Sequence, residues 1–130
     1  EHKIQRVGSE RDLIVDVRVI AATNKDLKKE IENGNFREDL YHRLAVIMVE
    51  VPELSRRKSD IPILISHFSK LISKEQGIEA KEFKKDSIKL LEDYDWSGNI
   101  RELRNVIERL IILAGNPISK DDVILFASKK

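Results

Sequence analysis

Four segments that follow Pro52 carry their apolar residues at the spacing of one helical face, and this pattern constrains the fold more than any other feature. The first segment begins at Asp60, and its apolar residues recur every three or four positions. Such a stripe covers one side of an α-helix and has to be buried against another element. The apolar residues of this stripe are Ile61, Leu64, Ile65, Phe68, Leu71 and Ile72.

Three further helices are predicted by the same periodicity. The second begins near Asp86 and the third begins at Asn99, with Leu103 at the centre of its stripe. The fourth begins at Ser119, where Asp122 stands three residues later in the position that closes a capping box. Four apolar stripes have to be buried together, so the sequence predicts a small helical bundle.

The residues before Pro52 indicate a different architecture. Residues 14–22 are rich in β-branched side chains, and residues 45–51 are almost wholly apolar, which is typical of strands buried in a parallel sheet. Two short helices are expected between them, over residues 26–33 and 36–44. A strand, helices and a second strand make a βαβ crossover, so the predicted fold class is α/β followed by all-α. The predicted parts are an α/β portion, 1–51, a charged linker, 52–59, and a helical portion, 60–127.

A short Asn-apolar-Arg-Glu pattern occurs twice, with Asn35 and Asn99 as its first residues. Each Asn stands where an N-cap belongs, with a Glu three residues later to close a capping box. The pattern places Arg37 and Arg101 in the first turn of a helix, where a cation is disfavoured by about 0.3–1 kcal/mol. An anion bound at the helix start would remove this conflict. The alternative is that each Arg extends into solvent from an ordinary cap.

Composition excludes several classes of function. With 24 basic and 23 acidic residues the net charge is +1, which argues against a strongly electrostatic nucleic-acid surface. The absence of cysteine excludes disulfides and thiol catalysis, and the three histidines lack metal-ligand spacing, so no metal site is predicted. The apolar runs are far shorter than the roughly 20 residues of a membrane span. We expect a cytoplasmic fragment without a membrane partner.

Three motifs occur in an order that is typical of one protein family. They are Val-Arg-Val-Ile-Ala-Ala-Thr-Asn at 17–24, Asn-Phe-Arg-Glu-Asp-Leu-Tyr-His-Arg-Leu at 35–44 and Trp-Ser-Gly-Asn-Ile-Arg-Glu-Leu at 96–103. They resemble the central domain of sigma-54-dependent transcriptional activators, the NtrC-like bacterial enhancer-binding proteins of the AAA+ superfamily. The resemblance runs from about Lys3 to Phe126 and covers the C-terminal half of such a domain. It implies a partial parallel-sheet AAA+ core followed by a four-helix lid subdomain.

The resemblance also implies roles for four side chains. Asn24 matches sensor I, a polar group near the γ-phosphate; the alternative is a strand-end Asn that caps the next helix. Arg37 and Arg43 match the two arginine fingers that act on a neighbouring subunit. They lie six residues apart, about 120° around a helix, so we expect one to reach the phosphate and the other to support it. Arg101 matches sensor II, which faces the nucleotide of its own subunit.

An alternative for the arginine fingers is an ordinary salt bridge with Glu38 or Asp39, which is compatible with a finger role between turnovers. Trp96 is expected to be a core anchor that fixes the start of the helix carrying Arg101. The linker reads Pro-Glu-Leu-Ser-Arg-Arg where the family usually has Pro-Pro-Leu-Arg-Glu-Arg, and Ser97 replaces the usual Pro.

The resemblance implies partners and a substrate for a longer parent protein. It would hydrolyse ATP with Mg²⁺, self-associate into a ring, remodel the sigma-54 RNA polymerase holoenzyme through a Gly-Ala-Phe-Thr-Gly-Ala loop, and bind DNA through a separate domain. This chain contains no Gly-x4-Gly-Lys-Ser/Thr phosphate loop, no acidic pair for Mg²⁺ and no such sigma-contacting loop. We therefore expect the chain alone to be inactive and to bind no nucleotide tightly.

Two other functions stay open at this point. The same elements could form a non-enzymatic module for oligomerisation or regulation. They could also belong to another AAA+ machine, such as a helicase loader or a protease unfoldase.

Overall fold

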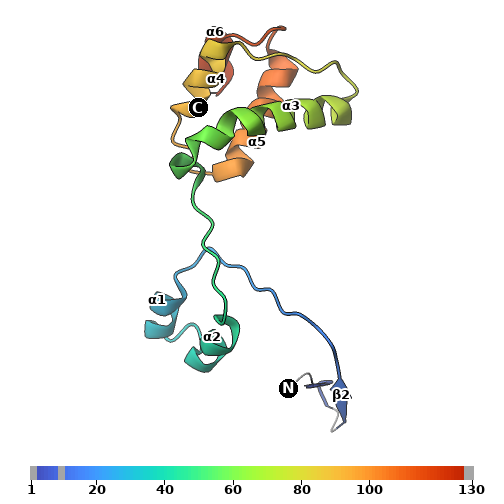
Figure 1. Cartoon of the computed structure of the whole chain (residues 1–130), viewed down its shortest axis with the longest axis vertical. Coiled ribbons are helices and arrows are strands. Elements are labelled where there is room, and N and C mark those ends of the chain that lie inside the picture. The colour runs from blue at the N-terminus through green and yellow to red at the C-terminus, as the bar shows by residue number, and fades with distance from the viewer. Residues whose placement is uncertain (1–2, 9–10, 128–130) are drawn as a thin grey trace. The chain divides into compact units, whose positions relative to one another are not determined.

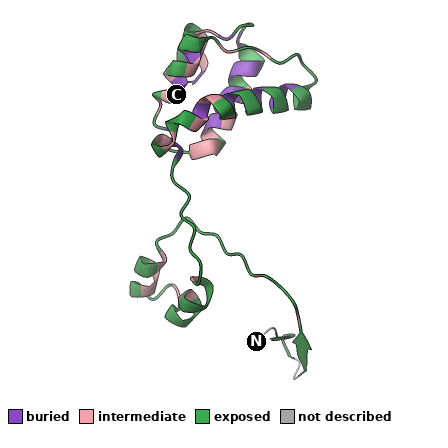
Figure 2. Ribbon diagram, viewed as in Figure 1, coloured by how far each residue is buried: buried purple, intermediate pink, exposed green. Residues whose placement is uncertain are grey.

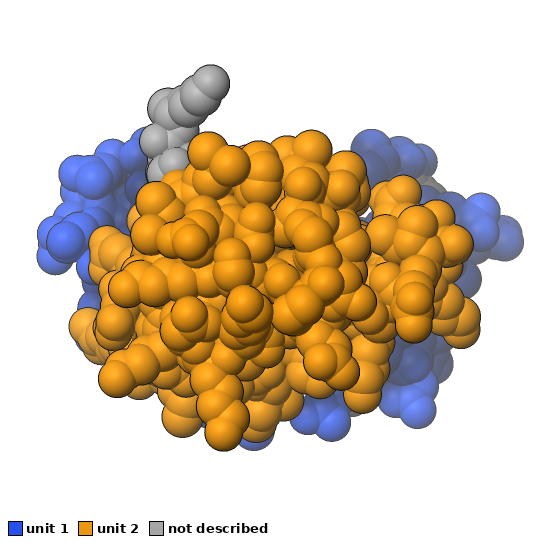
Figure 3. Space-filling view, turned by 90° about the horizontal axis from the view of Figure 1, so that it is seen from above, with its two compact units in different colours: residues 1–50 blue, residues 51–130 orange. Residues whose placement is uncertain are grey.

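The computed structural model describes residues 3–8 and 11–127 of the chain. Its residues fall into two compact units, Glu1–Glu50 and Val51–Lys130, which are coloured separately in Figure 3. Figure 1 labels the helices and strands of both units.

The first unit begins with a hairpin and continues with two short helices. Strand β1 (Lys3–Gln5) pairs antiparallel with β2 (Asp12–Ile14). Helices α1 (Leu27–Glu32) and α2 (Glu38–Leu44) follow. None of the described residues of this unit is buried, as Figure 2 shows.

Helix α1 has the boundaries that its sequence predicts. The side chain of Asp26 caps the helix, because its Oδ1 accepts hydrogen bonds from the backbone N–H groups of Lys28 and Lys29 at 3.1 and 3.4 Å. Beyond the helix, Gly34 adopts a φ of 73°, in the left-handed region that glycine enters without steric cost. With its two cap residues, Asp26 and Asn33, helix α1 spans the predicted range 26–33.

The predicted parallel sheet is not formed, and the βαβ crossover is wrong for this chain. Among the described residues the only sheet is the β1–β2 hairpin, and residues 45–51 carry no strand. Val46 and Ile47 each expose 80% of their surface. A strand with two apolar faces needs hydrogen-bonding neighbours and a covering layer on each face, and the described residues supply neither for this segment. The apolar side chains of residues 45–51 are therefore largely exposed.

The second unit is helical, and its helices enclose one apolar core (Figures 1 and 2). Helix α3 packs against α5, while α6 contacts both α4 and α5. The elements in chain order are two 3₁₀ turns, η1 (Leu54–Arg56) and η2 (Lys58–Asp60), and four α-helices, α3 (Ile61–Gln76), α4 (Lys85–Glu92), α5 (Asn99–Leu113) and α6 (Lys120–Ala127).

The core contains apolar residues from the middle of the predicted helical stripes. It also contains one residue that the helical spacing of apolar residues does not predict. Leu103 is fully buried, as expected, and Ile65 and Ile72 of α3 are buried with it. Leu54 is also 0% exposed, although it belongs to the segment predicted as a charged linker. The 3₁₀ turns thus place an apolar side chain of this segment in the helical core.

The ends of the helices follow local signals in most cases. Gly77 ends α3 in the left-handed conformation, with a φ of 67°. Ser119 and Asp122 form the predicted capping box before α6: the Ser119 backbone N–H donates to Asp122 Oδ2 at 2.8 Å, and the Asp122 N–H donates to Ser119 Oγ at 3.3 Å. Asp86 lies in the first turn of α4 rather than at its start, because the N-cap of this helix is Lys84.

Candidate functional site

The start of helix α5, which carries Arg101, is built differently from the predicted cap. Gly98 is the N-cap residue, and its backbone N–H donates to Glu102 Oε2 at 2.8 Å. Asn99 is already the first helical residue, with a φ of 54°. Its side-chain oxygen accepts a 2.8 Å hydrogen bond from the Leu54 N–H instead of a bond from the helix. The prediction of an Asn99 cap is wrong because a tertiary contact occupies this side chain.

Trp96 fixes the turn before α5, as predicted. The indole is 3% exposed, and its Nε1 donates to the Leu91 carbonyl at 2.8 Å. The Asn99 N–H donates to the Trp96 carbonyl at 2.7 Å, which closes the turn. A buried aromatic anchor therefore sets the position from which Arg101 emerges.

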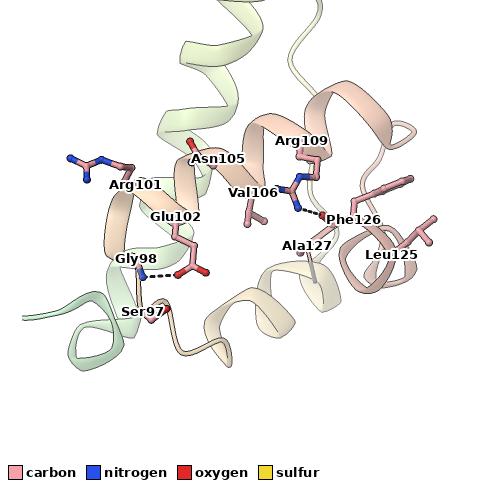
Figure 4. Close-up of a pocket in the computed structure, with 10 residues that line it drawn as sticks. All are labelled: Ser97, Gly98, Arg101, Glu102, Asn105, Val106, Arg109, Leu125, Phe126 and Ala127. Atoms are coloured by element: carbon pink, nitrogen blue, oxygen red, sulfur yellow. Dashed lines mark hydrogen bonds between the residues drawn. The ribbon is translucent and has the colours of Figure 1, made fainter. Parts of the chain in front are cut away.

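Arg101 lies at one end of an open groove of about 1040 Å³ between α5 and α6 (Figure 4). Val106 of α5 and Phe126 of α6 contribute apolar surface to the groove. In Figure 4 the Arg101 side chain extends away from the other labelled side chains. It is exposed, and within the described part of the chain it makes no hydrogen bond or ion pair. A guanidinium in this state offers its full set of donors to an anion.

Helix α2 in the first unit carries both predicted finger arginines. Arg37 is the N-cap residue of α2, so it lies before the first turn, and Asn35 does not cap the helix. The predicted capping box at Asn35 is therefore wrong. Gly34, Asn35 and Phe36 complete the turn after α1, where the N–H groups of Asn35 and Phe36 donate to the Glu30 carbonyl at 2.8 and 3.2 Å.

Arg37 forms a bidentate ion pair with Asp39. Its Nε lies 2.9 Å from Asp39 Oδ1 and its Nη2 lies 2.8 Å from Asp39 Oδ2. Hydrogen bonding to the Arg37 guanidinium holds the pKa of the Asp39 carboxyl below its usual value. The Arg37 side chain remains 81% exposed. This is the salt bridge that the sequence left open as an alternative to a finger role.

Arg43 and Asn24 are exposed, and among the residues that the structure describes neither has such a partner. Arg43 lies in the last turn of α2, so the two arginines stand at opposite ends of a seven-residue helix. Within the described residues Arg43 has no ion pair within 4.0 Å, although Asp39 attracts it over a longer distance. Asn24 lies in a bend before α1, and Thr23 Oγ1 accepts the Lys25 N–H there at 3.0 Å. The structure thus places Arg37 and Arg43 at opposite ends of α2, with Arg37 before its first turn.

Two side chains that stabilise the helical unit were not found from the sequence. Lys81 Nζ donates to the Ala114 carbonyl at 2.5 Å, at the C-terminal end of α5. Arg109 Nη1 donates to the Phe126 carbonyl in the last turn of α6 at 3.0 Å. Cations at helix C-termini are favourable. Because each partner belongs to a different segment of the chain, no local pattern marks these contacts.

Metal ligation and membrane insertion find no support in the residues that the structure describes. Over 3–8 and 11–127, no group of three His, Asp or Glu side chains is arranged to hold a metal ion. No helix in the same ranges has the length and apolar character needed to cross a bilayer.

Comparisons with known proteins assign both units. Residues 1–50 match the family described as Sigma-54 interaction domain, and residues 55–126 match the AAA+ ATPase lid domain. The chain is 47% identical over 115 residues to the nitrogen assimilation regulatory protein NtrX of Azorhizobium caulinodans, a match that covers 88% of this chain and 25% of the relative. It is 46% identical over 126 residues to the transcriptional regulatory protein ZraR of Salmonella typhimurium, a match that covers 96% of this chain and 29% of the relative.

Solved structures give the same result. The crystal structures of NtrX from Brucella abortus in complex with ADP and with ATP superpose with TM-scores of 0.82 and 0.80 at 40% identity. Each match covers 93% of this chain and 29% of that chain. This chain therefore spans between a quarter and a third of the length of these relatives.

Proposed function

The chain belongs to the AAA+ family of sigma-54-dependent transcriptional activators, and we propose that it is part of an ATPase domain that couples ATP hydrolysis to remodelling of the sigma-54 RNA polymerase holoenzyme. The observation that carries this proposal is the succession of a Sigma-54 interaction match over 1–50 and a lid match over 55–126. The first match favours sigma-54 activation over a helicase loader or a protease unfoldase. The activity itself would belong to a longer protein that contains this chain.

The proposed parts follow the predicted boundaries. Residues 1–51 would form the C-terminal part of the AAA+ α/β subdomain, 52–59 the linker and 60–127 a four-helix lid. In the longer protein the exposed apolar residues of 45–51 would be covered by further strands. The phosphate loop and the Mg²⁺ ligands would also come from sequence outside this chain, which contains neither motif.

Arg101 is proposed as the sensor II residue for ATP bound to the same subunit. Its guanidinium is exposed and has no partner in the described structure, so an incoming phosphate has no internal ion pair to displace. Arginine suits this role because its planar fork of donors matches phosphate oxygens and keeps its charge. The Gly98–Glu102 hydrogen bond and the buried Trp96 hold the helix start in place beneath it.

Arg37 and Arg43 are proposed as arginine fingers for the ATP of a neighbouring subunit. Both lie on the exposed surface of α2, where a second subunit could approach. The Arg37–Asp39 pair is open to solvent, and exposed ion pairs contribute little free energy, so a phosphate could take the place of Asp39 at low cost. Asn24 is proposed as sensor I, the polar group that positions the attacking water.

The proposed partners follow from these roles. Arginine fingers that act on a neighbouring subunit require the protein to self-associate. In this family the subunits assemble into a ring. Contact with the sigma-54 holoenzyme would use a loop outside this chain, and DNA binding would use a separate domain. The proposed location is the cytoplasm.

The proposal is tested with the longer protein and a sigma-54-dependent promoter. It predicts ATP hydrolysis together with ATP-dependent formation of open promoter complexes. Arg101→Ala should weaken nucleotide binding, whereas Arg104→Ala on the same helix should not, because Arg104 already pairs with Glu75 at 3.2 Å. ATP hydrolysis without any effect on promoter opening would contradict the sigma-54 role.

A further inference from the structure

We propose that Asn99 is a positioning residue that ties the segment entering the second unit to the start of the helix carrying Arg101. The proposal rests on the proposed role of Arg101 as a nucleotide-sensing residue. Asn99 would not touch the nucleotide. It would act through the backbone of the first turn of α5, in which Arg101 lies two residues later.

The contact that carries this proposal joins two distant segments of the chain. The Leu54 N–H donates a 2.8 Å hydrogen bond to Asn99 Oδ1, across 45 positions. Leu54 is fully buried and Asn99 is half-buried, so the bond is partly shielded from water. Leu54 lies three residues after Val51, where the second unit begins. The entry into this unit is therefore attached directly to the first residue of α5.

The backbone of Asn99 is adapted to this contact. Its φ of 54° lies in the left-handed region, which Asn tolerates better than most residues other than glycine. Asn99 is the first helical residue and Gly98 is the N-cap, so the Asn99 side chain does not occupy the capping position of α5. Its oxygen is used for Leu54 instead. A capping residue at this position would satisfy the helix but leave the entering segment unattached.

A link between these segments has a thermodynamic consequence. If the Asn99–Leu54 bond favours the helix start that presents Arg101 to a phosphate, then phosphate binding at Arg101 favours the same bond by the same factor. The nucleotide state would therefore be transmitted to residues 51–54, which lead into the second unit. A purely structural role for Asn99 predicts no such coupling.

Two substitutions separate the hydrogen bond from the backbone conformation. Asn99→Gly retains the freedom to adopt a positive φ but removes the acceptor, whereas Asn99→Asp retains both. Amide hydrogen exchange in the 130-residue chain should be faster at Leu54 in Asn99→Gly, by roughly three- to tenfold, the effect of one neutral hydrogen bond. Asn99→Asp should retain the protection of Leu54. Unchanged exchange in Asn99→Gly would overturn the proposal.

The coupling to Arg101 is measured as nucleotide affinity in the longer protein. Asn99→Gly should weaken ATP binding by roughly three- to tenfold when Arg101 is present and have no effect in an Arg101→Ala background. An equal loss in both backgrounds, or no loss in either, would overturn the link. Asn99→Asp would not isolate this effect, because its charge would act on Arg101 directly. If Arg101→Ala itself leaves ATP affinity unchanged, the proposed role of Arg101 fails, and the coupling that rests on it fails too.

Discussion

The indole nitrogen of Trp96 donates a 2.8 Å hydrogen bond to the backbone carbonyl of Leu91, and both side chains are buried in the core of the helical unit. This bond closes the connection between α4 and α5 from the inside. It satisfies the buried indole N–H, which would be left unpaired without it, whereas the Leu91 carbonyl also accepts the Tyr94 N–H at 3.4 Å. The direction in which α5 starts thus depends on one side chain.

Trp96→Phe should destabilise the chain by about 1–3 kcal/mol, because it removes this hydrogen bond and leaves a smaller ring in the same space. The free energy of unfolding in denaturant measures the effect. Tyr94→Phe is the matched control: Tyr94 packs against Trp96, but its hydroxyl makes no hydrogen bond within the described residues, so a change of less than about 0.5 kcal/mol is expected. Equal effects of the two substitutions would contradict the importance of the bond.

Leu103→Ala should cost about 2–5 kcal/mol of unfolding free energy, because Leu103 is 0% exposed at the centre of the core and its truncation leaves a cavity. Ile112 lies on the same helix but is 55% exposed. Ile112→Ala should therefore change the denaturation midpoint only slightly. A midpoint that Leu103→Ala does not move would show that α5 is not packed as described.

Gly98→Ala should destabilise the start of α5 by about 1–3 kcal/mol. A Cβ at this position would stand 2.8 Å from Glu102 Cβ, and moving Glu102 would break its bond to the Gly98 N–H. Gly115→Ala provides the comparison, because a Cβ there meets nothing within 4 Å. Thermal unfolding of the two variants should separate them clearly. Similar melting temperatures would refute the close contact.

The ends of helices in both units could be predicted from sequence where the determinants are local. Asp26 caps α1 and Ser119 forms a box with Asp122 because the partners of both lie within three residues. The Asn99 cap failed for the opposite reason: its oxygen is bound to the Leu54 N–H, 45 positions away. An N-cap pattern describes what a side chain can bind and cannot say which of two acceptable partners the fold supplies.

The predicted parallel sheet and the predicted arginine fingers also depend on partners that a local sequence pattern does not contain. The apolar character of residues 45–51 indicates burial, but a strand forms only when a neighbouring strand is present, and this one stays exposed. Arg43 lies on the predicted helix, but Arg37 is the N-cap residue before its first turn, and the ion pair of Arg37 with Asp39 was only one of two alternatives. Their action on a neighbouring subunit stays a prediction, because it depends on an assembly.

The capping box of α6 should make its stability depend on pH. The Ser119 hydroxyl and backbone N–H both donate to Asp122 and hold the pKa of its carboxyl below the ordinary value of 3.8. The stabilisation is therefore complete above pH 3.8 and is lost as the pH falls below this value through the pKa of the folded state. In an NMR titration, Ser119→Ala should raise the pKa of Asp122 towards 3.8. Ser55→Ala, in another turn, should leave it unchanged.

The finger arginines lead to a prediction about catalysis in the longer protein. Arg37→Ala or Arg43→Ala should lower ATP turnover by about 10³–10⁵ while nucleotide binding largely survives. A cation supplied by a neighbour acts on charge that develops in the transition state more than on bound ATP. His42→Ala, an exposed change on the same helix, is the control and should have little effect. Rates within about threefold of wild type for both arginine variants would refute the assignment.

Mixing two inactive proteins tests whether the arginines act across a subunit boundary. An Arg37→Ala protein keeps a sound phosphate loop, and a phosphate-loop variant of the longer protein keeps sound arginines. In a mixed assembly, some nucleotide sites would combine the intact loop of one subunit with the intact arginine of its neighbour, so part of the activity should return. Arginines that serve their own subunit would give no such rescue. If the arginines served their own subunit, every site in the mixture would lack either its phosphate loop or its arginine. Mixtures that remain inactive although mixed assemblies form would therefore exclude action in trans.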